Sequence, residues 1–177
     1  MKLKVISLFA GPGAGKSTCA AGLFARMKRL RFSVELVTEY AKDLTYEKSF
    51  SKLSNQLHVL AEQNYRIARL QDQVEYVITD SPIPLSLIYC KTEDQHWLEP
   101  LVANLWLEYD NYAFIVKRSA APYVKHGRNQ SEEEARALDA RIHELAHEYG
   151  AEIVIDPDIT GIEDQIIREV NWTRVPV

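Results

Sequence analysis

AGPGAGKS, residues 10–17, is the stretch of sequence that decides the fold. It matches the phosphate-binding loop pattern, with Ala10 in place of the usual first glycine. Its three glycines let the backbone wrap an anion with the N–H groups pointing inward, and the helix that follows adds the positive end of its dipole. Lys16 is expected to reach the terminal phosphates, and the Ser17 hydroxyl is expected to hold Mg²⁺. The predicted nucleotide-binding residues here are Gly11, Pro12, Gly13, Ala14, Gly15, Lys16, Ser17 and Thr18.

Strand-like and helix-like segments alternate along the chain. Short β-rich runs occupy residues 5–9, 34–38, 76–79, 112–116 and 153–155. Helical segments are expected at residues 17–30, 51–74, 97–109, 132–149 and 162–170. This order implies right-handed crossovers between parallel strands. We predict a single domain over residues 1–177: an α/β P-loop NTPase whose five-stranded parallel sheet carries helices on both faces.

The composition excludes several classes of protein. With 46% hydrophobic and 26% charged residues, the chain is not a disordered one. A net charge of -4 argues against a protein that coats nucleic acid non-specifically. The two cysteines sit in no metal-ligand spacing, and no apolar run approaches the ~20 residues of a membrane span. The N-terminus shows no signal-type cleavage region, so we expect a cytoplasmic protein without a membrane partner.

Acidic residues follow two of the predicted strands, at the sheet edge where such folds bind ligands. Asp80 closes the strand 76–79 and is predicted to order Mg²⁺ or to act in catalysis, with an Asx turn or helix cap as the alternative. Glu39 lies where the second strand ends and is a candidate base for an attacking hydroxyl. Tyr40 and Asp43 follow it as candidate substrate-binding residues, although a solvated acidic helix start would look the same.

The expected helix over residues 51–74 carries amides on an otherwise apolar face. Asn64 and Gln71 interrupt the apolar seam, and Gln63 lies beside it. An inward amide either hydrogen-bonds a substrate base or is satisfied within the core. Gln63 and Asn64 are therefore candidate substrate-binding residues. Candidates for stacking on a base, with burial in the core as the alternative, are Tyr40, Tyr65 and Tyr89.

A basic segment follows the fourth predicted strand. Its cations are Lys117, Arg118, Lys125, His126 and Arg128, and a capping box beginning at Ser131 opens the next helix. A basic loop ahead of a helix suits a short lid over about residues 118–131, whose arginines neutralise charge on a transferring phosphoryl group. Arg128 is the predicted catalytic arginine and Arg118 a predicted nucleotide ligand. A solvated basic loop is the alternative.

These features together resemble the small P-loop kinases of the nucleoside and nucleotide kinase superfamily. The resemblance rests on the phosphate loop, Glu39-Tyr40-Ala41, Ile78-Thr79-Asp80 and Gly127-Arg128. The order of features is similar to ribosylnicotinamide kinase domains and to bacteriophage 5-hydroxymethyluracil DNA kinases, which phosphorylate a modified base within DNA. The resemblance implies ATP and Mg²⁺ at residues 11–17, a carboxylate base from Glu39 or Asp80, and a lid arginine at Arg128.

One departure from the family pattern bears on the acceptor. Nucleoside monophosphate kinases often carry Asp-Gly-x-Pro after the third strand and thymidylate kinases carry Asp-Arg, whereas this chain has Asp80-Ser81-Pro82-Ile83. The missing arginine removes a usual contact to the acceptor, which favours a hydroxyl on a nucleoside, or on a base inside DNA, over free thymidylate. The expected activity is ATP-dependent phosphorylation of such a hydroxyl. The leading substrate is 5-hydroxymethyluracil in phage DNA, which implies thymidine hypermodification in the host cytoplasm.

Other acceptors and activities stay open at this point. A free nucleoside, nicotinamide riboside or a nucleoside monophosphate is the alternative acceptor. A P-loop ATPase or switch without kinase activity is a remote alternative, because Ile83 stands where a GTPase switch has glycine. A DNA acceptor needs a basic surface, which the segment 117–128 would supply together with Lys28, Arg29 and Arg31 if these lie close.

Overall fold

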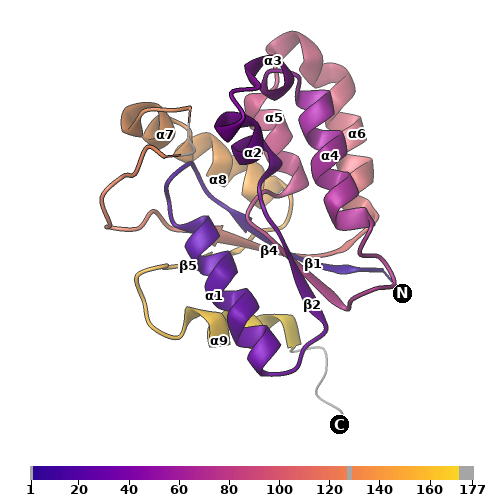
Figure 1. Cartoon of the computed structure of the whole chain (residues 1–177), viewed down its shortest axis with the longest axis vertical. Coiled ribbons are helices and arrows are strands. Elements are labelled where there is room, and N and C mark those ends of the chain that lie inside the picture. The colour runs from indigo at the N-terminus through magenta and orange to yellow at the C-terminus, as the bar shows by residue number, and fades with distance from the viewer. Residues whose placement is uncertain (1, 127–128, 172–177) are drawn as a thin grey trace.

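The sheet is parallel throughout and has the phosphate loop at the end of its central strand. The computed structural model describes residues 2–126 and 129–171 (Figure 1). Within these ranges the strands are β1 Lys4–Phe9, β2 Val34–Val37, β3 Tyr76–Thr79, β4 Asp110–Val116 and β5 Ile153–Ile155. They form one five-stranded sheet in the order β2-β3-β1-β4-β5, and every neighbouring pair is parallel. The prediction of a five-stranded parallel sheet is confirmed.

Helices cover both faces of this sheet. They are α1 Lys16–Arg29, α2 Tyr40–Tyr46, α3 Phe50–Leu53, α4 Gln56–Ala68, α5 Ser86–Tyr89, α6 Gln95–Leu107, α7 Glu132–Ala137, α8 Asp139–Glu148 and α9 Ile162–Asn171, with short 3₁₀ turns η1 Ile83–Leu85 and η2 Thr92–Asp94. Figure 1 shows α1 and α9 packed together on one side of the strands, with α4, α6 and α8 on the other. No helix in the described ranges is long and apolar enough to cross a membrane.

The strands bury alternate side chains in two separate cores. In β1, Val5 and Phe9 point into the core under α4, α6 and α8, while Ile6 and Leu8 point into the core under α1 and α9. All four side chains are at most 2% exposed. A parallel strand covered on both faces must be apolar along its whole length, which is why residues 5–9 contain one polar side chain, the buried Ser7.

Two expected helices are divided in the structure. The helix predicted over residues 51–74 is α3 followed by α4, because Asn55 caps α4 by accepting a hydrogen bond from the backbone N–H of His58 at 3.1 Å. It also ends early, at Ala68, and Asp72 then turns with a φ of 61°. The helix predicted over residues 132–149 is interrupted at Leu138, next to the point where the carbonyl of Ala135 accepts a hydrogen bond from Arg118.

Candidate active site

The phosphate loop joins β1 to α1 in the predicted place. Gly13 and Gly15 adopt φ values of 77° and 110°, which residues with a side chain rarely adopt. Gly15 caps α1, and its carbonyl accepts the first intrahelical hydrogen bond, from the N–H of Cys19 at 3.0 Å. The Lys16 ammonium donates to the carbonyls of Ala10 and Gly11 at 2.7 and 3.0 Å, so it is held over the loop. The loop therefore presents backbone N–H groups and one cation to the same small space.

Asp80, at the end of β3, meets the first turn of α1. The Ser17 hydroxyl donates a hydrogen bond to Asp80 Oδ2 at 2.5 Å. Asp80 is only 3% exposed, and its second oxygen, Oδ1, is buried without a hydrogen-bond partner in the described part of the chain. An unpartnered buried carboxylate oxygen is costly unless a cation compensates it. A hydroxyl and a carboxylate oxygen are the kind of ligands that Mg²⁺ takes, so the Ser17–Asp80 pair fits that ion.

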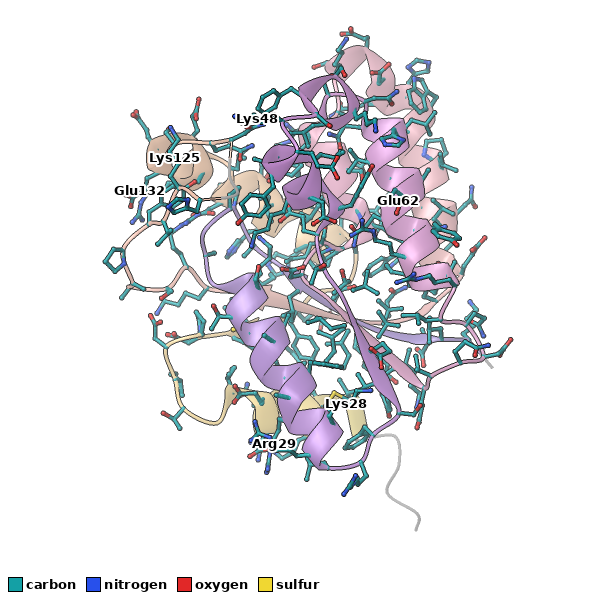
Figure 2. All side chains as sticks on the ribbon, viewed as in Figure 1. Lys28, Arg29, Lys48, Glu62, Lys125 and Glu132 are labelled. Atoms are coloured by element: carbon teal, nitrogen blue, oxygen red, sulfur yellow. The ribbon has the colours of Figure 1, made fainter. Side chains whose placement is uncertain are left out.

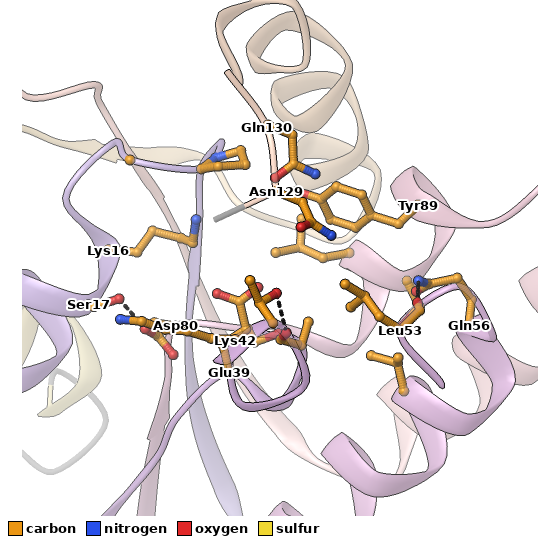
Figure 3. Close-up of a pocket in the computed structure, with 18 of the residues that line it drawn as sticks. Lys16, Ser17, Glu39, Lys42, Leu53, Gln56, Asp80, Tyr89, Asn129 and Gln130 are labelled. Carbon is orange, nitrogen blue, oxygen red and sulfur yellow. Dashed lines mark hydrogen bonds between the residues drawn. The ribbon is translucent and has the colours of Figure 1, made fainter. Parts of the chain in front are cut away.

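These groups open into a cavity of about 330 Å³ beyond the carboxyl ends of the strands. At one end it is lined by the phosphate loop and Asp80, as Figure 3 shows. At the other end it is lined by residues of α2, α3, α4, η1 and α5. Segment 129–130, on the way to α7, closes a third side. A volume of this order matches a single small ligand rather than a macromolecular groove.

Glu39 lies in this cavity, between the two ends (Figure 3). Strand β2 ends at Val37, and Glu39 stands at the N-cap position of α2 with extended backbone angles. Its carboxylate therefore projects from the turn between strand and helix, on the side facing the phosphate loop. A carboxylate in that position can accept a proton from a hydroxyl bound at the far end of the cavity.

The far end of the cavity is an apolar pocket with a few polar groups. The apolar wall is formed by Phe50, Leu53, Val59, Leu85 and the ring of Tyr89. Hydroxyl and amide groups there come from Thr45, Ser54, Gln56 and Ser86. Desolvation raises the pKa of the Tyr89 phenol above its ordinary value, and the negative charge of Glu39 raises it further. Tyr89 is therefore a neutral hydrogen-bond donor at neutral pH.

The sequence matches a protein family over most of its length. Residues 5–165 match the family model described as an AAA domain. The chain belongs to the AAA domain family. No curated protein matches the sequence significantly.

Solved structures similar to this AAA domain protein are P-loop proteins. The NadR protein in complex with NR aligns over 99% of this chain, with a TM-score of 0.70 and 20% identity; the chain spans only 53% of that NadR chain. Deoxyadenosine kinase from M. mycoides with bound dATP aligns over 94% of this chain and 98% of its own, with a TM-score of 0.59 and 19% identity. An APS kinase from Mycobacterium tuberculosis aligns over 99% and 100%, with a TM-score of 0.51 and 13% identity. These likenesses show the α/β P-loop NTPase fold that the sequence predicted.

Four of the predicted substrate-binding residues have other partners in this AAA domain protein. Asp43 binds Arg66 at 2.8 Å, and the Tyr40 hydroxyl pairs with the His58 ring at 3.0 Å. None of the four, which include Gln63 and Asn64, lines the cavity described above. Asn64 Oδ1 accepts a hydrogen bond from Tyr109 at 2.7 Å on the other side of α4.

The side-chain amide of Gln63 links α4 to the ends of β2 and β3 by hydrogen bonds. It is 3% exposed, and its Oε1 accepts the backbone N–H of Tyr40 at 3.0 Å. Its Nε2 donates to the carbonyl of Thr38 and to Thr79 Oγ1, each at 3.4 Å. The alternative of a satisfied core amide describes it, because two of these partners are backbone groups and the third is the buried Thr79 hydroxyl. Gln63 therefore fixes the backbone on both sides of Glu39, through Thr38 and Tyr40.

The predicted lid residue Arg118 lies against the phosphate loop but is engaged by a carboxylate. Its Nε and Nη2 donate to both oxygens of Asp139 at 2.7 Å, Nη1 donates to the carbonyl of Pro12 at 3.0 Å, and Nη2 also reaches Ala135. A guanidinium has five N–H donors, so one of them is left for a nucleotide. Hydrogen bonding to Asp139 raises the pKa of Arg118 further. Arg128, the predicted catalytic arginine, lies outside the described residues.

Several cavity residues were not singled out from the sequence. They are Lys42, Thr45, Phe50, Leu53, Ser54, Gln56, Val59 and Ser86. Most of them lie on the short helices α2, α3 and α5, which have no strong periodic pattern in the sequence. Gln56 and Val59 lie in the first turn of α4, and the apolar pattern of that helix did not indicate that this end borders a cavity. Of the three tyrosines that are candidates for stacking on a base, Tyr89 lines the cavity. Tyr65 is 61% exposed on α4.

Proposed function

We propose that this protein is an Mg²⁺-dependent kinase that transfers the γ-phosphoryl group of ATP to a hydroxyl of a small nucleoside-type acceptor. One observation carries the proposal: a single cavity joins the phosphate loop and the Ser17–Asp80 pair to Glu39 and to an apolar pocket at its far end. Donor, base and acceptor positions thus share one cavity. Two of the similar structures are named as kinases, which agrees with this reaction class.

The residues present account for each part of the transfer. The loop N–H groups and Lys16 hold the phosphates, and Ser17 and Asp80 would hold Mg²⁺, which neutralises charge on the β- and γ-phosphates when bound. Glu39 accepts the proton as the acceptor oxygen forms its bond to the γ-phosphorus. The bond from that phosphorus to the bridging oxygen breaks, and ADP leaves with the electron pair. Catalysis of this kind is positioning plus electrostatic stabilisation, which charged and polar groups converging on one cavity supply.

The charges around the expected lid support a small-molecule acceptor over DNA. Lys117 is paired with Asp156 at 3.0 Å, and Arg118 with Asp139 at 2.7 Å. Figure 2 shows Lys28 and Arg29 at the end of α1 far from Lys125, so the two basic groups do not combine into one surface. Affinity for DNA comes mainly from cations free to meet phosphates. 5-Hydroxymethyluracil within DNA is therefore the competing acceptor in the test.

A radiolabelled γ-phosphate transfer assay with Mg²⁺-ATP tests the proposal, with Lys16→Ala as the inactive control. The acceptor panel contains free nucleosides, nicotinamide riboside, nucleoside monophosphates, duplex DNA with 5-hydroxymethyluracil, and unmodified duplex DNA. We expect label on a nucleoside-type small molecule and none with the Lys16→Ala variant. Label on the modified duplex alone would overturn the choice of acceptor, and ATP hydrolysis without any labelled acceptor would overturn the kinase proposal.

A further inference from the structure

Lys42 is a half-buried lysine that lines the cavity of the candidate site. No hydrogen bond or ion pair joins it to any residue in the described ranges, although the carboxylates of Glu39 and Asp80 line the same cavity. In Figure 3 its side chain extends from α2 toward the Ser17–Asp80 end. Its ammonium is therefore held near the reaction space without being neutralised by a neighbour.

The packing of α2 explains why Lys42 faces inward. Asp43 binds Arg66 of α4 at 2.8 Å, and the Arg66 guanidinium lies over the Tyr40 ring at 4.7 Å. Leu44 is fully buried. These contacts fix the rotation of the helix against α4 and the core. Residues three apart share a helix face, so Lys42 lies on the side of Glu39 and Thr45, both of which line the cavity.

The cavity needs cations on both sides of the phosphoryl group in transfer, and Lys42 can supply one of them. A phosphoryl group in transfer carries negative charge on three equatorial oxygens, and Lys16 and the loop N–H groups meet it from the donor side. Among the described lining residues, Lys16 and Lys42 are the cations. We propose that Lys42 is a catalytic residue that donates hydrogen bonds to the γ-phosphate oxygens from the acceptor side. The acceptor proton goes to Glu39. This inference rests on the proposed function.

Nucleotide affinity tests this inference without knowledge of the acceptor. We would measure the dissociation constants of AMPPNP and of ADP, each with Mg²⁺, for the wild-type protein, Lys42→Met and Lys42→Arg. The matched control is Lys52→Met, because Lys52 is an exposed residue of α3 outside the cavity. A charged hydrogen bond lost from the γ-phosphate weakens AMPPNP binding about tenfold or more and leaves ADP binding within about twofold. Lys42→Arg retains most of the AMPPNP affinity.

The outcomes separate this inference from the proposed function. Unchanged AMPPNP affinity in Lys42→Met, or an equal loss for AMPPNP and ADP, overturns the role of Lys42 alone. A wild-type protein that binds neither nucleotide overturns the proposed function and the inference together. With an acceptor in hand, Lys42→Met should lower kcat and leave the acceptor KM unchanged, whereas a raised acceptor KM at wild-type kcat would show that Lys42 binds the acceptor and would overturn the assignment. Thermal unfolding confirms that each variant is folded.

Discussion

Ser17 and Asp80 are 63 positions apart in the sequence, and the Ser17 hydroxyl donates a hydrogen bond to Asp80 at 2.5 Å. Strands β1 and β3 are neighbours in the sheet, so the loop after one and the carboxylate closing the other meet at its edge. The second oxygen of Asp80 has no partner in the described ranges of the chain. The Ser17–Asp80 pair and this unpartnered oxygen together form the proposed Mg²⁺ site.

Asp80→Asn should lower the kinase activity without lowering the stability of the protein. The substitution removes a charged ligand from the proposed Mg²⁺ site, so kcat should fall about 100-fold and the Mg²⁺ concentration needed for half-maximal activity should rise. It also removes a buried carboxylate charge that has no ion-pair partner among the described residues, so the Tm without nucleotide should be at least that of the wild type. The control is Asp72→Asn, at an exposed position with a φ of 61° that asparagine tolerates. Wild-type Mg²⁺ dependence in Asp80→Asn would contradict the assignment.

Glu39→Gln tests the proposed base. The amide keeps the size of the side chain but cannot take the acceptor proton, so kcat should fall by a factor of about 10² to 10⁴. AMPPNP affinity should stay near the wild-type value, because the phosphates are held by the loop. Glu47→Gln is the matched control, since Glu47 is exposed just after α2 and does not line the cavity. Transfer at the wild-type rate by Glu39→Gln would show that another group accepts the proton.

Gly13→Ala should damage the phosphate loop more than its backbone angle alone explains. A Cβ at Gly13 would lie 2.6 Å from ring atoms of Tyr123, and the φ of 77° adds strain. Gly161→Ala has a similar φ of 87° but meets no atom within 4 Å, so it isolates the backbone cost of about 1–2 kcal/mol. We expect Gly13→Ala to lose more unfolding free energy than Gly161→Ala and to weaken AMPPNP binding. Tyr123→Ala should restore part of both losses, and equal losses at the two glycines would refute the role of the ring.

Cys19 should make stability depend on alkaline pH. Burial raises the pKa of its thiol from 9.0 to about 11 in the folded protein, with Glu163 and Asp158 adding to the shift. Between those values the unfolded chain has released a proton that the folded chain retains, so the free energy of unfolding falls as pH rises through this window. Urea unfolding of wild type and Cys19→Ala at about pH 8 and about pH 10 measures it. The fall should be smaller in Cys19→Ala, and identical falls would contradict the prediction.

The sheet and the phosphate loop could be predicted because their signals are local. Residues 10–17 carry both the loop glycines and the start of α1, and the five apolar runs each correspond to one strand of the sheet. The break at Asn55 also had a local signal, since asparagine is a preferred N-cap, but the apolar pattern across it favoured one helix. Periodicity gives the face of a helix but not the caps that divide it.

The acceptor end of the site could not be predicted because it depends on tertiary packing. Lys42 and Asp43 are neighbours in the sequence, yet Arg66 holds one outside the cavity and the rotation of α2 directs the other into it. The position of Gln63 in the sequence makes it a candidate to hydrogen-bond a substrate base, yet its amide is bonded to the backbone groups of Thr38 and Tyr40. Arg118 likewise carries a carboxylate partner, Asp139, that stands 21 residues away. The sequence reveals that a loop residue is basic, but it does not reveal which acidic group in the folded protein pairs with it.

The central position of β1 ties the integrity of the site to that of the whole domain. Its side chains enter both cores, and it is hydrogen-bonded to β3 and β4 on its two sides. Its amide protons can therefore exchange with solvent only when both helix layers have separated from the sheet. The phosphate loop is the direct continuation of this strand. Nucleotide binding and helical circular dichroism should therefore be lost at the same temperature, in one cooperative transition.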